Sequence, residues 1–485
     1  MQQEAGRSAL TERAHEVEAK SATFRKELGV TDLILTQILF VVGSGWVGTA
    51  AKLGDSHIVF WLLAVLLFYL PQAAVVIYLN RLMPMEGGIY QWATTGLGRF
   101  PGYLVGWNLW AFSVTIIGTF SVMIATNISY LLGPAFASIT QHGWYTPLVS
   151  AATIVGITFV TVFGLRVGKW LQNLGGAAQF FTYSALVIVP FVALRRGTIT
   201  EYHPFNAAMP AATAFSLNIF GKMALGALSG FEYVALLAGE CRNPARTIRT
   251  AVLVAAPVIA LMFILGTGSV LAIVPNDQID LVSPIPQTLV MGFSGMGFAR
   301  LIVPALILLL VLRQIGAVSL IFAGNTRLPM VVGWDGLLPG WFTKLHSRFR
   351  TPVNSIILVG CITLAFTLAG QIGVGVQEAF QLLENAAGIL YAFVYLGLFA
   401  IPLIGARRLA QRPPLWLQLA CLSGFAVTLL YSILSVFPII DVESWQVFSF
   451  KIVSVLALTQ VIGIAIYLAG RRSVRKRTTE VAVHA

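Results

Sequence analysis

Long apolar stretches with almost no charged residues follow one another along the chain. Residues 101–165 contain no Asp, Glu, Lys or Arg, and because a transmembrane helix needs about 20 apolar residues, this run must contain two of them. Segments such as residues 61–67 are apolar on every side, which excludes a soluble helical bundle. The alternating polarity of an outer-membrane barrel is not found in the sequence. The pattern therefore predicts an all-α integral membrane protein.

Taken in order, the apolar stretches predict twelve transmembrane helices. Their limits are residues 31–53, 57–80, 101–131, 145–165, 170–194, 213–239, 250–274, 299–326, 353–371, 377–404, 414–437 and 447–470. If both chain ends are cytoplasmic, the cytoplasmic segments contain 24 of the 31 Lys and Arg residues. By the positive-inside rule, this asymmetry predicts cytoplasmic termini. Residues 1–26 lack the apolar core of a signal peptide, so we expect the first helix to be retained.

Composition agrees with this topology. The chain is 57% hydrophobic and only 10% charged, with a mean hydropathy of +0.82, whereas a soluble domain carries about 25% charged residues. The net charge of +12 follows from the basic cytoplasmic segments, and no nucleic-acid-binding motif is visible. The cysteines, at 241, 361 and 421, are scattered, so we expect no disulfide framework, metal site or cofactor.

A glycine cluster lies in the middle of the first apolar stretch, at residues 43–48. Each glycine disfavours a helix interior by about 1 kcal/mol relative to alanine, so three of them in six residues predict an interrupted helix. Non-helical backbone at membrane depth survives only where it is buried in protein or lines a wet cavity. The alternative is that the small residues only let two helices pack closely.

A second cluster, residues 226–232, lies in the middle of the sixth stretch and carries a carboxylate beside its glycines. Two interrupted segments in corresponding positions of two halves indicate the substrate site of an inverted-repeat transporter. The pair of clusters therefore favours a binding site over simple close packing.

Four motifs in order resemble the amino acid/polyamine/organocation transporter superfamily, and its amino acid permeases in particular. They are the first glycine cluster, the Glu-Gly-Gly-Ile-Tyr-Gln-Trp loop at 86–92, Phe231-Glu232 with Asn243-Pro244 and Arg246, and the block from 335–339 to 351–354. The resemblance covers about residues 25–405. It implies a secondary transporter of amino acids or related amines that resides in the cytoplasmic membrane.

The resemblance also implies two inverted five-helix repeats, followed by two additional helices. The expected organisation is a cytoplasmic tail at 1–30, repeats at 31–194 and 213–404, helices 11 and 12 at 414–470, and a basic cytoplasmic tail at 471–485 that lies against anionic lipid.

In such transporters the first break binds the substrate carboxylate and sixth-helix carbonyls accept from its ammonium group, as the partial charges of half-helix ends favour. The substrate-binding residues implied here are Gly43, Ser44, Gly45, Trp46, Val47, Gly48, Leu228, Ser229, Gly230, Phe231, Glu232 and Ser319. Ser319 stands where some exchangers place an aromatic gate, which suggests a roomier pocket.

One position departs from the proton-coupled branch of the family. That branch has a lysine on the fifth helix at the first break, where this chain has Gln179. Glutamine cannot titrate, so the sequence argues against the simplest proton symport and leaves a counter-substrate as an alternative to a proton.

Three further charges lie inside predicted spans, at Lys222, Arg313 and Glu384. Charges at membrane depth are rare and usually functional. We expect Glu384 to pair with Arg313 or Lys222 in an outer gate; the alternative is a static ion pair that serves helix packing.

Other classes of function fit less well. A non-transporting amino-acid sensor on the same fold would favour a long regulatory extension, and the tails here are short. A channel would need a filter-like loop, and an enzyme a nucleophile, metal ligands or a histidine cluster, none of which the sequence offers. Which amino acid is carried, and the oligomeric state, do not follow from the sequence.

Overall fold

The computed structural model describes residues 29–83, 88–163, 165–203, 205, 207–231, 244–334, 336–405, 409 and 411–484. Every regular element within these residues is a helix, as the apolar pattern predicts. Ten of the described helices are long and apolar enough to cross a membrane.

The described first half of the chain contains several very short helices as well as long ones. The elements are α2 (Val30–Val41), α3 (Gly45–Ala51), η1 (Gly54–Ser56), α4 (His57–Ala64), η2 (Val65–Tyr69), α5 (Leu70–Leu82), α6 (Gly88–Leu97), α7 (Arg99–Leu132), η3 (Pro134–Phe136), α8 (Ala137–Thr140), α9 (Tyr145–Val162) and α10 (Leu165–Arg196). α4, η2 and α5 run on as one span, in which η2 is a π-helical turn ahead of Pro71. Such a turn lets a helix absorb a proline.

The described part of the second half of the chain is also helical. Its elements are α11 (Ala214–Gly221), η4 (Lys222–Ala227), α13 (Pro244–Ile273), η6 (Asn276–Gln278), α14 (Pro284–Gly292), α15 (Ala299–Trp334), η7 (Gly340–Thr343), α16 (Val353–Gly370), α17 (Val376–Ile404), α18 (Leu415–Leu434) and α19 (Trp445–His484).

The predicted first span, at residues 31–53, consists of α2 and α3 with residues 42–44 non-helical between them. In the described part of the predicted sixth span, at residues 213–239, α11 continues directly into the π-helical turn η4, and residues 229–230 are non-helical. α15 and α19 extend beyond their predicted ends at 326 and 470. For α19 the extension is the basic run expected to form a tail, and Lys and Arg are good helix formers.

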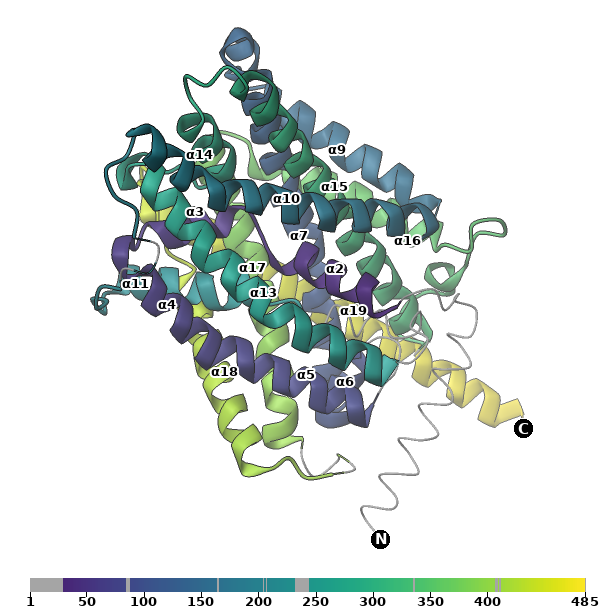
Figure 1. Ribbon diagram of the computed structural model, residues 1–485. Coiled ribbons are helices and arrows are strands. Elements are labelled where there is room, and N and C mark those ends of the chain that lie inside the picture. Colours follow the sequence, from purple (N-terminus) through teal and green to yellow (C-terminus); the bar gives the residue numbers. More distant parts are fainter. Residues whose placement is uncertain are drawn as a thin grey trace.

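The two short N-terminal helices lie inside the bundle. Figure 1 shows α2 and α3 with a non-helical connection between them, and both α10 and α13 pack against α2. α7 packs against both α15 and α17, and α15 also packs against α10.

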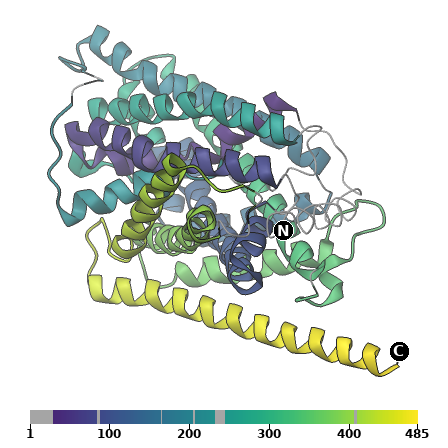
Figure 2. The ribbon, with the colours of Figure 1, turned by 90° about the horizontal axis from the view of Figure 1, so that it is seen from below.

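The last helix lies along one side of the molecule (Figure 2). It is tied to α7 by polar contacts: Trp107 Nε1 donates to the Thr459 carbonyl at 2.9 Å, and Gln460 Nε2 donates to Asn108 Oδ1 at 2.6 Å. α19 therefore covers α7 from outside and leaves the centre of the bundle to other helices.

Candidate functional site

The first non-helical segment is residues 42–44, between α2 and α3. Two side chains from other helices satisfy the carbonyl groups that the break exposes. Arg313 Nη1 on α15 donates to the Val42 carbonyl at 3.2 Å, and the Tyr183 hydroxyl on α10 donates to the Gly43 carbonyl at 3.0 Å. The break is thus held by protein groups, as an interruption inside a membrane requires.

Ser44 extends this support through a chain of polar side chains. Gln314 Nε2 lies 3.5 Å from Ser44 Oγ, Asn127 Nδ2 donates to Gln314 Oε1 at 2.7 Å, and Ser283 Oγ donates to Asn127 Oδ1 at 2.7 Å. The network joins α15, α7 and the start of α14 to the first break.

The second non-helical segment is residues 229–230, directly after η4. Gly230 has a φ of +123°, a conformation that favours glycine. Gln72 Nε2 donates to the Leu228 carbonyl, the Gly230 N–H donates to the Tyr395 hydroxyl at 2.8 Å, and that hydroxyl donates to Gln72 Oε1 at 2.7 Å. α5 and α17 therefore fix this segment as α10 and α15 fix the first.

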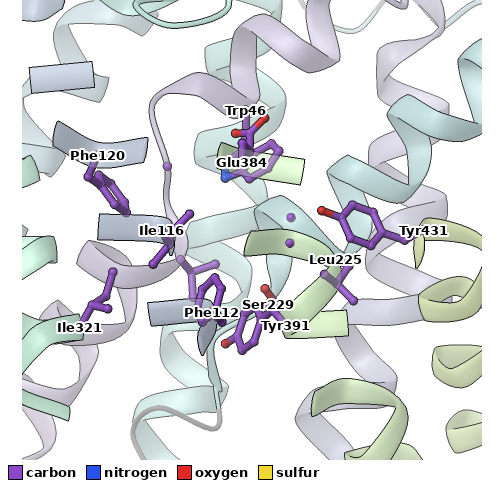
Figure 3. Close-up of a pocket in the computed structure, with 14 residues that line it drawn as sticks. Trp46, Phe112, Ile116, Phe120, Leu225, Ser229, Ile321, Glu384, Tyr391 and Tyr431 are labelled. Carbon is purple, nitrogen blue, oxygen red and sulfur yellow. The ribbon is translucent and has the colours of Figure 1, made fainter. Parts of the chain in front are cut away.

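A pocket lies between the two segments (Figure 3). Its walls come from α2 and α3 on one side, η4 on another, and α7, α15, α17 and α18 around them. The lining residues are Val41, Gly43, Trp46, Phe112, Ile116, Phe120, Leu225, Gly226, Ser229, Ile321, Glu384, Gly388, Tyr391 and Tyr431. Figure 3 shows Trp46 and Glu384 at one end and Ser229 and Tyr391 at the other.

Helical spacing explains which side chains reach the pocket. On α7 they are Phe112, Ile116 and Phe120, four residues apart, and on α17 they are Glu384, Gly388 and Tyr391. Positions at i, i+4 and i+7 or i+8 share one face of a helix. Phe112 and Tyr391 also stack on each other, with ring centroids 4.0 Å apart.

Glycines leave space for the rings of Trp46 and Tyr431. A Cβ atom at Gly43 would lie 2.5 Å from Trp46 Cδ1, and one at Gly226 would overlap the far edge of the same indole. On α17, a Cβ at Gly388 would overlap the Tyr431 hydroxyl. The indole of Trp46 is thus packed between a glycine of the first segment and a glycine of η4.

Glu384 is the charged side chain of the lining. It is 6% exposed, and within the described residues no donor lies at hydrogen-bonding distance from its carboxylate. Lys222 is close enough to interact electrostatically with Glu384, but the Lys222 ammonium group donates to Asn385 Oδ1. The described residues contain no ion pair within 4 Å that includes Glu384.

Arg313 is engaged elsewhere. It is fully buried, its guanidinium lies 5.8 Å from the centre of the Phe120 ring, and its bonded partner is the Val42 carbonyl. A cation at the carboxyl end of α2 is favoured by the partial negative charge of that helix end. Of the two partners expected for Glu384, the geometry therefore favours Lys222.

Four of the sequence-derived site residues line the pocket: Gly43, Trp46, Ser229 and Glu384. The remaining described ones do not line it, namely Ser44, Gly45, Val47, Gly48, Leu228, Gly230, Phe231, Ser319, Gln179, Lys222 and Arg313. Glu232 lies outside the described residues, as do Asn243 and Asp335 of the family motifs.

Several residues of the first cluster face other helices. A Cβ at Gly45 would lie 3.3 Å from the Leu281 carbonyl oxygen, a Cβ at Gly48 would lie 2.8 Å from Pro284, and Val47 packs against Gly266. The side-chain positions of these residues therefore serve close packing, as in the alternative explanation for the cluster, while the main-chain N–H groups of Gly45 and Val47 lie in the first turn of α3.

On α10 and α15 the expected positions are buried beside the site. Gln179 is fully buried, and neither of its amide atoms has a partner among the described residues. It lies one helical turn before Tyr183, which binds Gly43. Ser319 is 4% exposed, and α15 contributes Ile321 to the pocket instead.

Sequence reasoning missed the aromatic wall. Phe112, Phe120, Tyr391 and Tyr431 lie in spans whose other faces are equally apolar, so hydropathy does not single them out. A signal was present in α17, where Glu384 has Gly388 and Tyr391 on its own face.

Comparison with known proteins identifies the family. The family model described as amino acid permease matches residues 28–469. The chain belongs to this permease family. Human b(0,+)-type amino acid transporter 1 is 24% identical over 438 residues, which cover 88% of this chain and 86% of that protein. An uncharacterized transporter of Legionella pneumophila is 25% identical over 383 residues, which cover 78% and 80% of the respective chains.

A solved structure supports the fold. MhsT in complex with L-phenylalanine matches with a TM-score of 0.62 and 14% identity, over 84% of this chain and 98% of that one. Together with the ten apolar helices, these likenesses make the chain a multi-pass membrane protein of a transporter family and not an enzyme.

Proposed function

We propose that this permease is a secondary transporter that carries amino acids or related amines across the cytoplasmic membrane by alternating access. The observation that carries the proposal is the pocket between residues 42–44 and 229–230. Both segments contribute to its wall, so a molecule in the pocket touches both, and a movement of either one opens or closes it.

The proposed substrate position uses the polar groups at these segments. The N–H groups at the start of α3, from Gly45 to Val47, receive no side-chain cap from Ser44, and we assign them to the substrate carboxylate. The aromatic and aliphatic wall from α7, η4 and α15 then surrounds the substrate side chain.

For the topology we propose twelve helices in two inverted five-helix repeats and two additional helices, with the first span interrupted between α2 and α3 and the sixth span interrupted at residues 229–230. The basic residues support cytoplasmic termini. Lys222 and Glu384, which both lie on the proposed outer half, are assigned to the outer gate.

Uptake into proteoliposomes tests this function. Labelled amino acids should accumulate inside vesicles that contain the purified permease, and unlabelled substrate on the inside distinguishes exchange from uniport. A sensor on the same fold would bind an amino acid without any uptake, and a channel would show flux that does not saturate.

We further predict that uptake depends only weakly on an imposed pH gradient. The buried position beside the first segment is Gln179, and an amide takes up no proton at any working pH. Uptake should therefore change less than about twofold between vesicles with and without an inward proton gradient, and internal substrate should stimulate it more strongly. A several-fold stimulation by the gradient alone would contradict this, and Glu232 would then be the next carboxylate to test.

A further inference from the structure

Of the three carbonyl groups expected to receive the substrate ammonium, those of Leu228, Ser229 and Phe231, two are already engaged. Gln72 Nε2 donates to the Leu228 carbonyl, and Gln37 Nε2 lies 3.5 Å from the Phe231 carbonyl. A carbonyl oxygen that accepts from a buried amide offers less to a ligand, since displacing the amide strands its N–H group. The Ser229 carbonyl is the remaining one of the three, and a carboxylate is a stronger acceptor for an ammonium group than a neutral carbonyl.

The Glu384 carboxylate is suited to accept from the substrate ammonium, because it lies in the pocket wall and has no hydrogen-bond donor among the described residues. The carboxylate lines the pocket on the same face of α17 as Gly388 and Tyr391, it is 6% exposed, and no described donor lies at hydrogen-bonding distance from it. A buried carboxylate without a bonded cation is costly, and Lys222 offsets this charge only from a distance because its ammonium group is bonded to Asn385.

The other lining residues suit an amine with an apolar side chain better than a carboxylic acid. Among the described residues, five aromatic side chains line the pocket, at positions 46, 112, 120, 391 and 431, and no Lys or Arg does. Aromatic faces attract cations and apolar groups. The Arg313 guanidinium lies 5.8 Å from the centre of the Phe120 ring and is bonded to the Val42 carbonyl.

We propose that Glu384 binds the ammonium group of the substrate, and that the pocket accepts amines with an aromatic or branched aliphatic body whether or not they carry a carboxylate. The inference rests on the proposed transport function and specifies its substrate class. The amino group becomes the essential feature, and the carboxylate a secondary one.

Matched analogues test the inference on the unaltered protein. One series is phenylalanine, 2-phenylethylamine and 3-phenylpropionate, and the other is leucine, isopentylamine and 4-methylpentanoate. Binding to the purified permease is measured by calorimetry. Loss of the ammonium group should lower affinity by about 10- to 100-fold more than loss of the carboxylate, as expected for a hydrogen bond between charged groups. If the acids bind as well as the amines, the inference is wrong.

A pair of variants locates the effect. Glu384→Gln should lower affinity for the amines and amino acids by about 10- to 100-fold and leave affinity for the acids within about twofold. The control is Glu378→Gln, on the same helix, where the carboxylate lies 3.8 Å from Lys451 at the surface; it should leave every affinity unchanged. Undiminished amine binding by Glu384→Gln overturns the inference.

The possible failures are distinguishable. If Glu384→Gln does not fold, the two series on the unaltered protein still decide, since they need no substitution. If the protein binds and transports amino acids but binds the acids as tightly as the amines, the proposed transport function is retained. Only the proposed role of Glu384 is then rejected. If no member of either series and no other amino acid binds, the proposed function itself fails.

Discussion

Gly226→Ala is expected to destabilise the permease and to lower substrate affinity at least about tenfold, although alanine normally favours a helix by about 1 kcal/mol. The added methyl group would overlap the Trp46 indole, and overpacking of a filled interior costs about 1–3 kcal/mol. The ring lines the pocket, so a displacement of the ring changes the space for the substrate. Thermal unfolding and substrate binding of the purified variant measure the two effects.

Gly156→Ala provides the matched control. Gly156 lies in α9, and a Cβ atom there meets nothing within 4 Å, so this substitution should be neutral or slightly stabilising. Adding Trp46→Phe to Gly226→Ala shortens the ring and should recover stability while altering which substrates bind. Equal behaviour of the two alanine variants would show that Trp46 is not confined as described.

The two glycine clusters predict where the described helices end, but they do not predict the length of the non-helical segments. The first non-helical segment is only residues 42–44. Gly45 and Gly48 belong to α3, where their lack of a side chain lets Leu281 and Pro284 approach. Helix propensity predicts where a helix is weak, whereas the approach of a distant loop depends on tertiary structure.

The pocket wall was beyond sequence reasoning for a related reason. A membrane span that is apolar on all sides gives no sign of which face meets lipid and which faces the interior. Phe112 on α7 and Phe181 on α10 are equivalent in hydropathy, yet one is 5% and the other 61% exposed. Only the packing of α7 against α17 determines that Phe112 stacks on Tyr391.

The charges show the same limit in another form. Sequence placed Lys222, Arg313 and Glu384 within spans, where a charge must find a partner. The sequence could not predict that neutral groups would bind both cations. The Lys222 ammonium group donates to Asn385 Oδ1, and Arg313 donates to the Val42 carbonyl. A carboxylate is then left facing the pocket without a bonded cation among the described residues.

The largest effects on stability are expected from neutralising these charges singly. Removing one member of a bonded buried charge pair costs about 3–5 kcal/mol because the other is stranded, and this is the upper limit here because the Lys222 ammonium group is bonded to Asn385. The electrostatic interaction joins Glu384 to Lys222, whereas Arg313 is bonded to the first non-helical segment. Glu384→Gln and Lys222→Met should therefore each lower the free energy of unfolding and impair uptake strongly.

Double-mutant cycles separate the two candidate partners. Glu384→Gln with Lys222→Met should cost less than the sum of the singles by about 0.5–3 kcal/mol, while Glu384→Gln with Arg313→Met should be additive within about 0.5 kcal/mol. The cycle with Arg313 is the matched control, because it also removes a fully buried cation. If Glu384 acts in transport, as a gate partner or as the acceptor of the substrate ammonium, the first double variant regains stability but not uptake, since the carboxylate is still missing from the pocket. Recovery of both would reduce the pair to helix packing, and additive losses in both cycles would mean that the charges act separately and that no gate joins them.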